Sequence, residues 1–473
     1  MRNSEKTDKP YSSLQFLGGA GTVTGSKYLI SVNGRQILLD AGLFQGLKEL
    51  RLRNWKKPAF DPSAIDAVVL SHAHIDHSGY LPLLAREHFH RNIFCTSGTS
   101  DLLKIMLPDA AHLQEEEAAM ANRHGYSKHK PALPLYTIKD AEAAIKLLKT
   151  CQYEKPVSVA QDITAIFRRA GHILGSATVE LLLGRDNPIR LVFSGDLGRW
   201  GQPILRDPEF VPEADVLLVE STYGDRIHPP FLNVMNDLQR IIHESIQRGG
   251  ALIVPAFAVG RTQELVWMIR QLEEQGRIPS LPVYVDSPMV INVTDIYCRH
   301  PEDHNLEMAQ LMDKDKCPLC CKQYHLVRTP EESRQLNKIS SPAIIISSSG
   351  MATGGRVLHH LKLRLPDPKT TVLLVGFQAA GTRGRSLREG AKVVRIHGQD
   401  IPVNAKIEML DGLSAHADRD EILKWLSGFK KTPKQTYAVH GESKSADSLA
   451  ETIRVKLGWN VQVAVDGEKV ALI

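Results

Sequence analysis

The chain has 473 residues, of which 42% are hydrophobic and 23% charged, and its formal net charge is +5 at pH 7. This length exceeds that of one ordinary domain, so we expect two domains or one domain that carries a large insertion. No apolar run approaches the roughly 20 residues of a membrane-spanning helix, the start of the chain has no apolar signal core, and the six cysteines are too unevenly spaced for a disulfide framework. These features argue against a membrane protein and a disulfide-rich secreted protein, and they predict a globular protein of the cytoplasm.

The N-terminal part begins with predicted strands and turns. Residues 14–17 form a first short strand, and residues 28–39 form a hairpin that turns at Asn33-Gly34. The glycine-rich segment 18–25 lacks the Lys-Ser/Thr pair of a phosphate-binding loop, so we interpret it as a structural turn. The hairpin ends at Asp40, which is either an ordinary turn residue or a carboxylate that holds a metal ligand or a bound water in place.

The most informative segment follows the hairpin. Residues 67–70 are an apolar run of strand type, and residues 80–84 are typical of the first turn of a helix. The loop between them contains four side chains that can bind a metal, namely His72, His74, Asp76 and His77. Positions 72, 74 and 76 can point one way while position 77 turns back, so one loop can serve two adjacent metals. Imidazole and carboxylate are a combination of ligands that suits zinc. We therefore favour a zinc-binding loop over the alternative, a polar loop with stray histidines.

Helices are predicted over residues 97–107, 109–123 and 137–148, and the last of them opens with a capping box at Thr137-Ile138-Lys139-Asp140. Three apolar strands follow, and each ends in a candidate ligand. The strands that begin near residues 163, 190 and 215 end at His172, Asp196 and Glu220. Successive strands with such ends are what a metal site at one edge of a sheet requires.

From about residue 225 the pattern changes to alternating strands and helices. We expect helices over residues 231–247 and 260–276, and strands over residues 251–254, 283–285 and 343–346. This alternation predicts a parallel sheet with its own helices.

A Ser/Gly-rich loop leads from the last of these strands into a helix. Backbone N–H groups at such a helix start can bind an anion. The candidates for binding substrate phosphate are Ser348, Ser349, Gly350 and Arg356. A plain loop is the alternative. Between residues 354 and 397, nine Lys and Arg residues stand against two acidic residues, which is either a solvated face or a basic surface opposite the metals.

The remaining candidates lie in the last third of the chain. Cys317, Cys320 and Cys321 contain one CxxC pair without a second pair, so we favour reduced loop cysteines over a separate zinc site. Strands are predicted over residues 406–410 and 435–439. His416 lies in the loop after the first of these strands, and His440 directly follows the second.

These motifs together resemble the metallo-β-lactamase superfamily and, within it, the β-CASP nucleases. The HxHxDH loop, His172 and Asp196 match the metal motifs of the superfamily in order. Glu220, His416 and His440 match the first, second and third β-CASP motifs. The match spans nearly the whole chain, which is most similar to the bacterial and archaeal relatives of the pre-mRNA 3′-end cleavage endonuclease subunit.

The resemblance implies an α/β fold. An αββα metallo-β-lactamase sandwich is expected from residues 1–224 and 396–473, and an inserted β-CASP domain with a mainly parallel sheet flanked by helices from residues 225–395. The resemblance also implies two zinc ions. His72, His74 and His172 would hold one ion, Asp76, His77 and His440 the other, and Asp196 would bridge them. Asp76 would also count among the catalytic residues, with His416 as general acid, Glu220 orienting its ring, and Asp40 supporting the ligands.

The activity that the resemblance implies is two-metal hydrolysis of RNA phosphodiester bonds. A histidine in the third motif, His440, is typical of the RNA-processing branch, so RNA in single-stranded form is the expected substrate. We favour endonuclease action and keep 5′–3′ exonuclease action as an alternative, and a homodimer is an assembly that the sequence leaves open. The sequence contains neither the N-terminal KH modules of archaeal relatives nor the C-terminal extension of ribonuclease J, so the partner contacts and end selection of those modules are not expected.

Two other classes of function explain less of the sequence. A small-molecule metallohydrolase, such as a lactonase or a thioesterase, needs the metal loop but not Glu220, His416 or the basic part of the insert. A non-catalytic RNA-binding scaffold would have lost ligands, whereas every ligand position is filled here.

Overall fold

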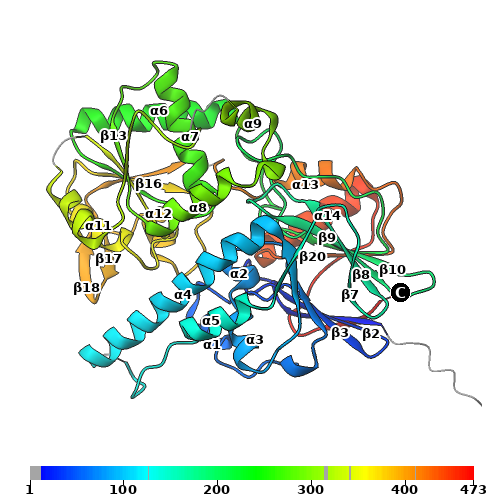
Figure 1. Cartoon of the computed structure of the whole chain (residues 1–473). Helices are drawn as coiled ribbons and strands as arrows, with labels where there is room; N and C mark the ends of the chain where they lie inside the picture. The colour runs from blue at the N-terminus through cyan, green and yellow to red at the C-terminus, as the bar shows by residue number, and fades with distance from the viewer. Residues whose placement is uncertain (1–11, 126, 314–317, 340–341, 411, 473) are drawn as a thin grey trace, which may run out of the picture.

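The computed structural model describes residues 12–125, 127–313, 318–339, 342–410 and 412–472. The strands belong to three large sheets and a two-stranded ribbon. Two sheets lie together in one part of the molecule, and the third lies in a second part that is made from the middle of the chain and drawn in green to orange (Figure 1).

The first sheet has seven strands in the order β22-β1-β2-β3-β4-β5-β6. It is antiparallel from β22 to β3 and parallel from β3 to β6. Its strands are β1 (Ser13–Gly18), β2 (Lys27–Val32), β3 (Arg35–Leu39), β4 (Ala67–Val69), β5 (Ile93–Thr96), β6 (Leu148–Cys151) and β22 (Lys469–Ala471). The predicted hairpin is β2–β3, in which Ile30 pairs with Ile37.

The second sheet also has seven strands, in the order β21-β20-β11-β10-β9-β8-β7. They are β7 (Val157–Ala160), β8 (Ile163–Arg169), β9 (Ala177–Leu183), β10 (Ile189–Phe193), β11 (Val216–Glu220), β20 (Gln435–Val439) and β21 (Val461–Val463). After the insert the chain adds β20 to this sheet beside β11, and β10, β11 and β20 are mutually parallel. The residues that follow these three strands therefore meet at one edge of the sheet.

The two sheets pack face to face through large buried side chains. The rings of Phe16 and Tyr437 lie 5.2 Å apart across the interface, as do those of Tyr28 and Phe193. Helices cover the outer faces. They are α3 (Leu81–Arg86), α4 (Ser97–His124) and α5 (Ile138–Ile145) on the first sheet, and α13 (Arg419–Leu426) and α14 (Ser443–Leu457) on the second. Two short helices, α1 (Lys48–Arg53) and α2 (Ile75–Ser78), precede α3. The predicted αββα sandwich is confirmed.

The insert contains a six-stranded sheet in the order β14-β13-β15-β12-β16-β19, with every neighbouring pair parallel. Its strands are β12 (Leu252–Pro255), β13 (Pro282–Val285), β14 (Gln323–Leu326), β15 (Ile344–Ser347), β16 (Thr371–Val375) and β19 (Lys406–Leu410). Its helices are α6 (Phe231–Arg248), α7 (Arg261–Glu274), α8 (Pro288–Cys298), α9 (Leu306–Met312), α10 (Pro330–Gln335), α11 (Val357–Arg364) and α12 (Arg383–Arg388). Apolar clusters lie on both faces of the sheet, so the predicted parallel sheet flanked by helices is confirmed.

The end of the insert is marked by a strand that returns to its sheet. β19 pairs with β16 along five residues, and the ribbon β17 (Val393–Ile396) and β18 (Gln399–Pro402) lies before it in the chain. We therefore propose that the inserted domain ends near residue 410 rather than at residue 395. The sequence between residues 396 and 410 carries no signal for which sheet it joins.

Three predicted helices differ from the observed ones. The helices expected over residues 97–107 and 109–123 are a single helix, α4, with Pro108 inside it. Leu103, Leu107 and Ala111 on either side of the proline are all fully buried, and this burial outweighs the hydrogen bond that proline removes. The helix expected over residues 137–148 has the predicted capping box but ends at Ile145, because Leu148 begins β6.

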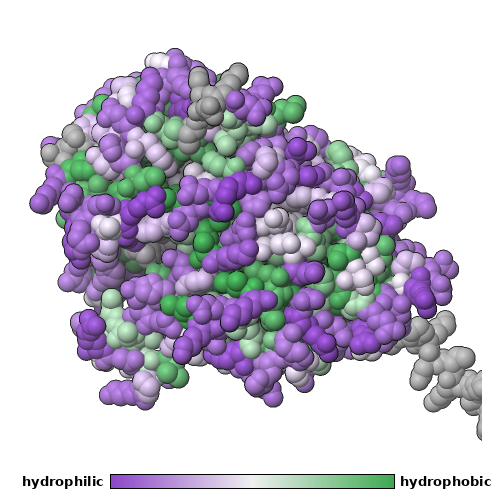
Figure 2. Space-filling model, in the orientation of Figure 1, coloured by the Kyte–Doolittle hydropathy of each residue, from purple (hydrophilic) through white to green (hydrophobic). Residues whose placement is uncertain are grey.

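The face of the molecule in Figure 2 is mainly hydrophilic, with smaller apolar areas between the charged side chains. Among the residues that the structure describes, no helix has both the length and the apolar character needed to cross a membrane.

Candidate metal centre

The predicted ligands lie where strands of both sheets end. His72 and His74 follow β4, Asp76 and His77 lie in α2, His172 follows β8, Asp196 follows β10, and His440 follows β20. The structure brings all seven into two adjacent groups of donor atoms. The shared sheet edges explain why residues so far apart in sequence meet.

The first ligand set consists of His72, His74, His172 and Asp196, whose donor atoms lie within 4.8 Å of one another. His74 Nδ1 lies 3.1 Å from His72 Nε2 and 3.2 Å from His172 Nε2. Asp196 Oδ2 lies 3.5 Å from His72 Nε2 and 3.6 Å from His172 Nε2. Four converging donors match the number that zinc takes in proteins.

The second ligand set consists of Asp76, His77 and His440. His440 Nε2 lies 3.0 Å from His77 Nε2 and 3.6 Å from Asp76 Oδ2. Asp196 Oδ1 lies 3.3 Å from His77 Nε2 and 3.2 Å from His440 Nδ1. The two oxygens of Asp196 therefore face different sets. Burial alone would raise the pKa of Asp196, but His440 and His77 outweigh it and hold that pKa well below its ordinary value.

The chemistry of these donors fits divalent cations. Asp196 Oδ1 and His172 Nδ1 are buried and have no hydrogen-bond partner among the described residues. Burial, followed by the neighbouring His77, holds the pKa of His72 well below its ordinary value, and burial lowers the pKa of His74 to about 4. Neutral imidazoles offer lone pairs to a cation, and a buried carboxylate is stabilised beside one.

Asp40 holds His77 on the side away from the ligand atoms. Asp40 Oδ2 lies 2.6 Å from His77 Nδ1, and the carboxylate accepts hydrogen bonds from the backbone N–H and the hydroxyl of Ser71, both at 2.7 Å. Burial lowers the pKa of His77, but Asp196 and Asp40 outweigh it and raise that pKa well above its ordinary value. Asp40 and His440 both have left-handed backbones, with φ of 55° and 47°, and such strained positions gather at functional sites.

His416 lies between β19 and α13, beside the first ligand set. Its Nδ1 lies 3.0 Å from Glu220 Oε2 and 3.8 Å from Asp196 Oδ2. Glu220 is fully buried and accepts the Leu197 backbone N–H at 2.5 Å. Burial lowers the pKa of His416, but Glu220 and Asp196 outweigh it and raise that pKa above its ordinary value. Nε2 of His416 has no hydrogen-bond partner in the described part of the chain, so one ring nitrogen is fixed and the other is free.

Three residues that sequence reasoning missed hold the loop that carries His416. His228 Nε2 lies 3.1 Å from the His416 carbonyl oxygen. Arg261 donates to the Leu413 carbonyl at 2.6 Å, and Arg199 donates to the Gly412 carbonyl. Each is a single polar residue outside any recognised motif, and its role arises only from tertiary contacts. The one local signal that could have drawn attention to Arg261 was Gly260, which directly precedes it at the start of α7.

The four candidates for phosphate binding, Ser348, Ser349, Gly350 and Arg356, lie in the insert between β15 and α11. The Ser348 hydroxyl lies 2.9 Å from that of Ser287. Arg356 donates to the buried Asp286 at 2.8 Å and to two backbone carbonyls. Its guanidinium is thus already engaged within the insert, and the contact of these four residues with substrate phosphate stays a prediction.

The cysteine cluster lies partly within the described residues. Cys321 is buried and Cys320 partly exposed, and Cys317 lies outside the described residues. Within the ranges that the structure describes, no third donor joins Cys320 and Cys321 in a metal-binding group.

Comparison with known proteins agrees with this geometry. Residues 35–249 match the beta-lactamase superfamily domain, residues 262–387 the Beta-Casp domain, and residues 400–464 a Zn-dependent metallo-hydrolase RNA specificity domain. The chain is 35% identical to ribonuclease TTHA0252 of Thermus thermophilus over 453 residues, which cover 96% of this chain and 98% of that protein. The chain belongs to the β-CASP family of metallo-β-lactamase proteins.

A second β-CASP relative is transcription termination factor FttA of Methanocaldococcus jannaschii, which is 31% identical over 93% of this chain and 68% of that protein. The fold is also similar to the crystal structure of a protein of unknown function from Enterococcus faecalis V583, with a TM-score of 0.54, 13% identity, and coverage of 98% of this chain and all of that one. The predicted family is confirmed, and with it the assignment of the chain as a metal-dependent hydrolase of a nuclease family.

Proposed function

We propose that the chain is a zinc-dependent ribonuclease that hydrolyses RNA phosphodiester bonds at a centre with two metal ions. The observation that carries the proposal is Asp196, whose two oxygens face separate ligand sets beside the His416–Glu220 pair. A single hydrolytic zinc needs only three protein ligands, whereas seven converge here. RNA is favoured as substrate because a ribonuclease is similar over nearly the whole chain and because residues 400–464 match an RNA specificity domain.

In this proposal the first ligand set would hold one zinc ion and the second set the other, with one oxygen of Asp196 facing each set. When bound, the ions supply Lewis-acid stabilisation of the phosphoryl oxygens and lower the pKa of the attacking water. The lowered pKa values of His72 and His74 favour the neutral imidazoles that a metal ligand requires. Asp40 then keeps the His77 ring in the orientation that presents Nε2 to the site.

His416 donates a proton to the leaving oxygen from Nε2. Glu220 holds Nδ1 and fixes the ring, and together with Asp196 it raises the pKa of His416, so the protonated form persists closer to neutral pH. Glu220 is fixed in turn by the Leu197 N–H. A general acid is most effective when its pKa lies near the working pH.

Single-stranded RNA is the proposed form of the substrate. The centre is recessed, because most ligands are buried and the side chains of Asp76 and His416 are only 22% and 16% exposed. A flexible single strand reaches such a site more easily than a stiff duplex. Endonuclease action is favoured, with 5′–3′ exonuclease action as the alternative. The cytoplasmic location and the homodimer stay predictions.

A cleavage assay tests this function and its rivals. The wild-type chain is incubated with RNA labelled at its 5′ or 3′ end, with single-stranded DNA of the same sequence, and with lactone and thioester substrates. Internal RNA fragments would mean an endonuclease, and mononucleotides from one end an exonuclease. Turnover of a lactone or thioester with RNA left intact would favour the small-molecule hydrolase. Bound zinc with no turnover of any substrate would favour the scaffold and refute the proposal.

A further inference from the structure

The His172 loop (residues 170–176) carries a ligand of the first set and is only partly held by its own domain. The Ser176 hydroxyl accepts the backbone N–H groups of His172 and Ile173, at 3.0 and 3.3 Å. The Gly175 carbonyl accepts two threonine hydroxyls at the start of α4, at 2.5 and 2.9 Å. These bonds fix the base of the loop and one carbonyl, but they leave two backbone N–H groups at its tip.

The inserted domain satisfies those two groups. The Leu174 N–H donates to the Tyr297 hydroxyl at 3.3 Å, and the Gly175 N–H donates to Asp303 Oδ2 at 3.0 Å. Leu174 and Tyr297 are at most 1% exposed, and Asp303 is 6% exposed. Water therefore has little access to replace these acceptors, and a buried N–H group that loses its partner carries the full cost of its desolvation.

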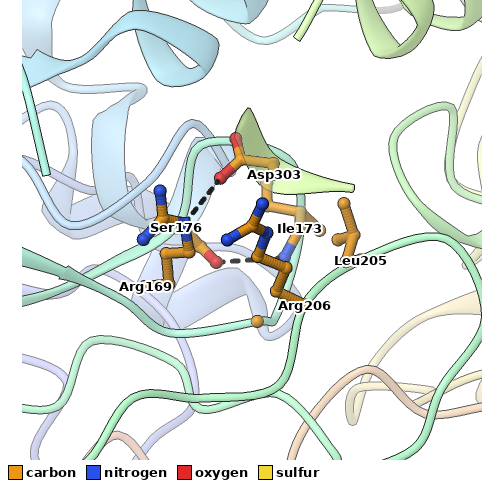
Figure 3. Close-up of a pocket in the computed structure, with 7 residues that line it drawn as sticks. Arg169, Ile173, Ser176, Leu205, Arg206 and Asp303 are labelled. Carbon is orange, nitrogen blue, oxygen red and sulfur yellow. Dashed lines mark hydrogen bonds and ion pairs between the residues drawn. The ribbon is translucent and has the colours of Figure 1, made fainter. Parts of the chain in front are cut away.

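Asp303 belongs to a docking segment (residues 297–305) that is itself firmly placed. The Arg206 backbone N–H donates to the Asp303 carbonyl at 2.9 Å, and the Asn305 N–H donates to the Ile204 carbonyl at 2.8 Å. Figure 3 shows the Asp303 carboxylate facing Arg169, with Arg206 beside it, around the small pocket that the loop and the segment enclose. The sandwich thus holds the segment in place, and the segment presents a fixed acceptor to the loop.

We infer that Asp303 of the inserted domain is a positioning residue for His172, so that docking of the insert and metal binding by the first ligand set are coupled. Without the carboxylate, the Gly175 N–H is unpaired and the loop relaxes, which moves His172 away from His74. The coupling is reciprocal. If docking of the insert strengthens metal binding by the first ligand set, metal binding strengthens docking by the same factor. The second ligand set comes from α2 and from the end of β20, so it is not affected.

The test rests on the proposed metal sites and uses zinc alone as the probe. Zinc affinity is measured by titration of the metal-free full-length chain. In a His440→Ala background, which leaves only the first ligand set complete, Asp303→Ala is expected to weaken zinc binding by about tenfold or more, as for other partners that orient a metal ligand. In a His172→Ala background the same change is expected to have little effect on the remaining zinc.

Two variants separate positioning from a general loosening of the interface. Asp303→Asn keeps a carbonyl acceptor for the Gly175 N–H and is expected to recover most of the lost affinity. Asp101→Ala is the matched control, because it removes another carboxylate contact across the same interface, to His300 at 3.1 Å. It is expected to leave zinc affinity unchanged. Hydrogen exchange of the Leu174 and Gly175 amides should be faster in Asp303→Ala and normal in the control.

The inference is overturned if Asp303→Ala leaves the first-set affinity unchanged, if it weakens both sets equally, or if Asp101→Ala has the same effect. Tyr297→Phe removes only the hydroxyl that accepts the Leu174 N–H and keeps the ring, so it serves if Asp303→Ala does not fold. It too should weaken the first set selectively, and unchanged binding would contradict the inference. Failure of the wild-type chain to bind any zinc would instead refute the proposed function.

Discussion

Replacing His416 with alanine removes the proposed general acid but no proposed metal ligand. The Nδ1 atom of His416 lies 3.8 Å from Asp196 and is already held by Glu220 at 3.0 Å. General acid catalysis contributes roughly 10²- to 10⁴-fold in rate, which corresponds to about 3–5 kcal/mol of transition-state stabilisation. We therefore expect His416→Ala to slow single-turnover RNA cleavage by about a hundredfold to ten-thousandfold, with zinc content at the wild-type level.

The assay follows end-labelled RNA at saturating enzyme and measures zinc by elemental analysis of the same samples. Only the protonated imidazole donates, so wild-type cleavage should fall as the pH rises through the raised pKa of His416. Glu220→Gln removes the carboxylate that contributes most to raising this pKa, so the fall should move to lower pH. Zinc loss in proportion to the loss of rate would show that His416 is a ligand and refute the reasoning.

Three further substitutions test the surroundings of the centre. Asp40→Asn keeps one acceptor oxygen but no longer matches the three hydrogen bonds of the carboxylate, so titration should show about 10- to 100-fold weaker zinc binding by the set that contains His77. Gly175→Ala should lower the free energy of unfolding by about 3 kcal/mol in chemical denaturation, because φ is +76° and the added Cβ would meet the Thr99 backbone nitrogen; unchanged stability would contradict this. Arg356→Ala should lower stability by about 2 kcal/mol, because a buried carboxylate loses a charged partner. If Arg356 also binds phosphate, the slope of log RNA affinity against log salt should fall by about 1, and an unchanged slope would remove it from the RNA contact.

Local sequence patterns were enough to predict individual strands. They were not enough to predict which distant strands pair with one another. The strands that end at Asp196, Glu220 and His440 are short apolar runs followed by polar residues, so each is visible within a few residues of sequence. The prediction of two helices around Pro108 was wrong, because a proline usually ends a helix. The burial of side chains on both sides of Pro108, which keeps the helix continuous, depends on the whole fold and is not visible locally. The membership of β19 in the insert depends on its pairing with β16, which no local signal encodes.

The same distinction applies to the site. The seven ligand positions are those that the family resemblance implies, and the structure places them in two adjacent groups. Arg261, Tyr297 and Asp303 could not be predicted, because each acts through a contact between the insert and the sandwich. For Arg356, the loop before a helix predicts a phosphate contact but not the ion pair with Asp286 that the fold makes, and the phosphate contact stays a prediction.

The central claim, two-metal hydrolysis of RNA, is tested most directly by titrating zinc into the metal-free chain while following RNA cleavage. The structure has two ligand sets that share Asp196, so cleavage should reach its maximum only near two zinc ions per chain. Asp76→Ala, which removes a ligand of the second set, should leave cleavage close to background at every zinc concentration. Full cleavage at one zinc per chain, or two bound zinc ions without any RNA cleavage, would contradict the account.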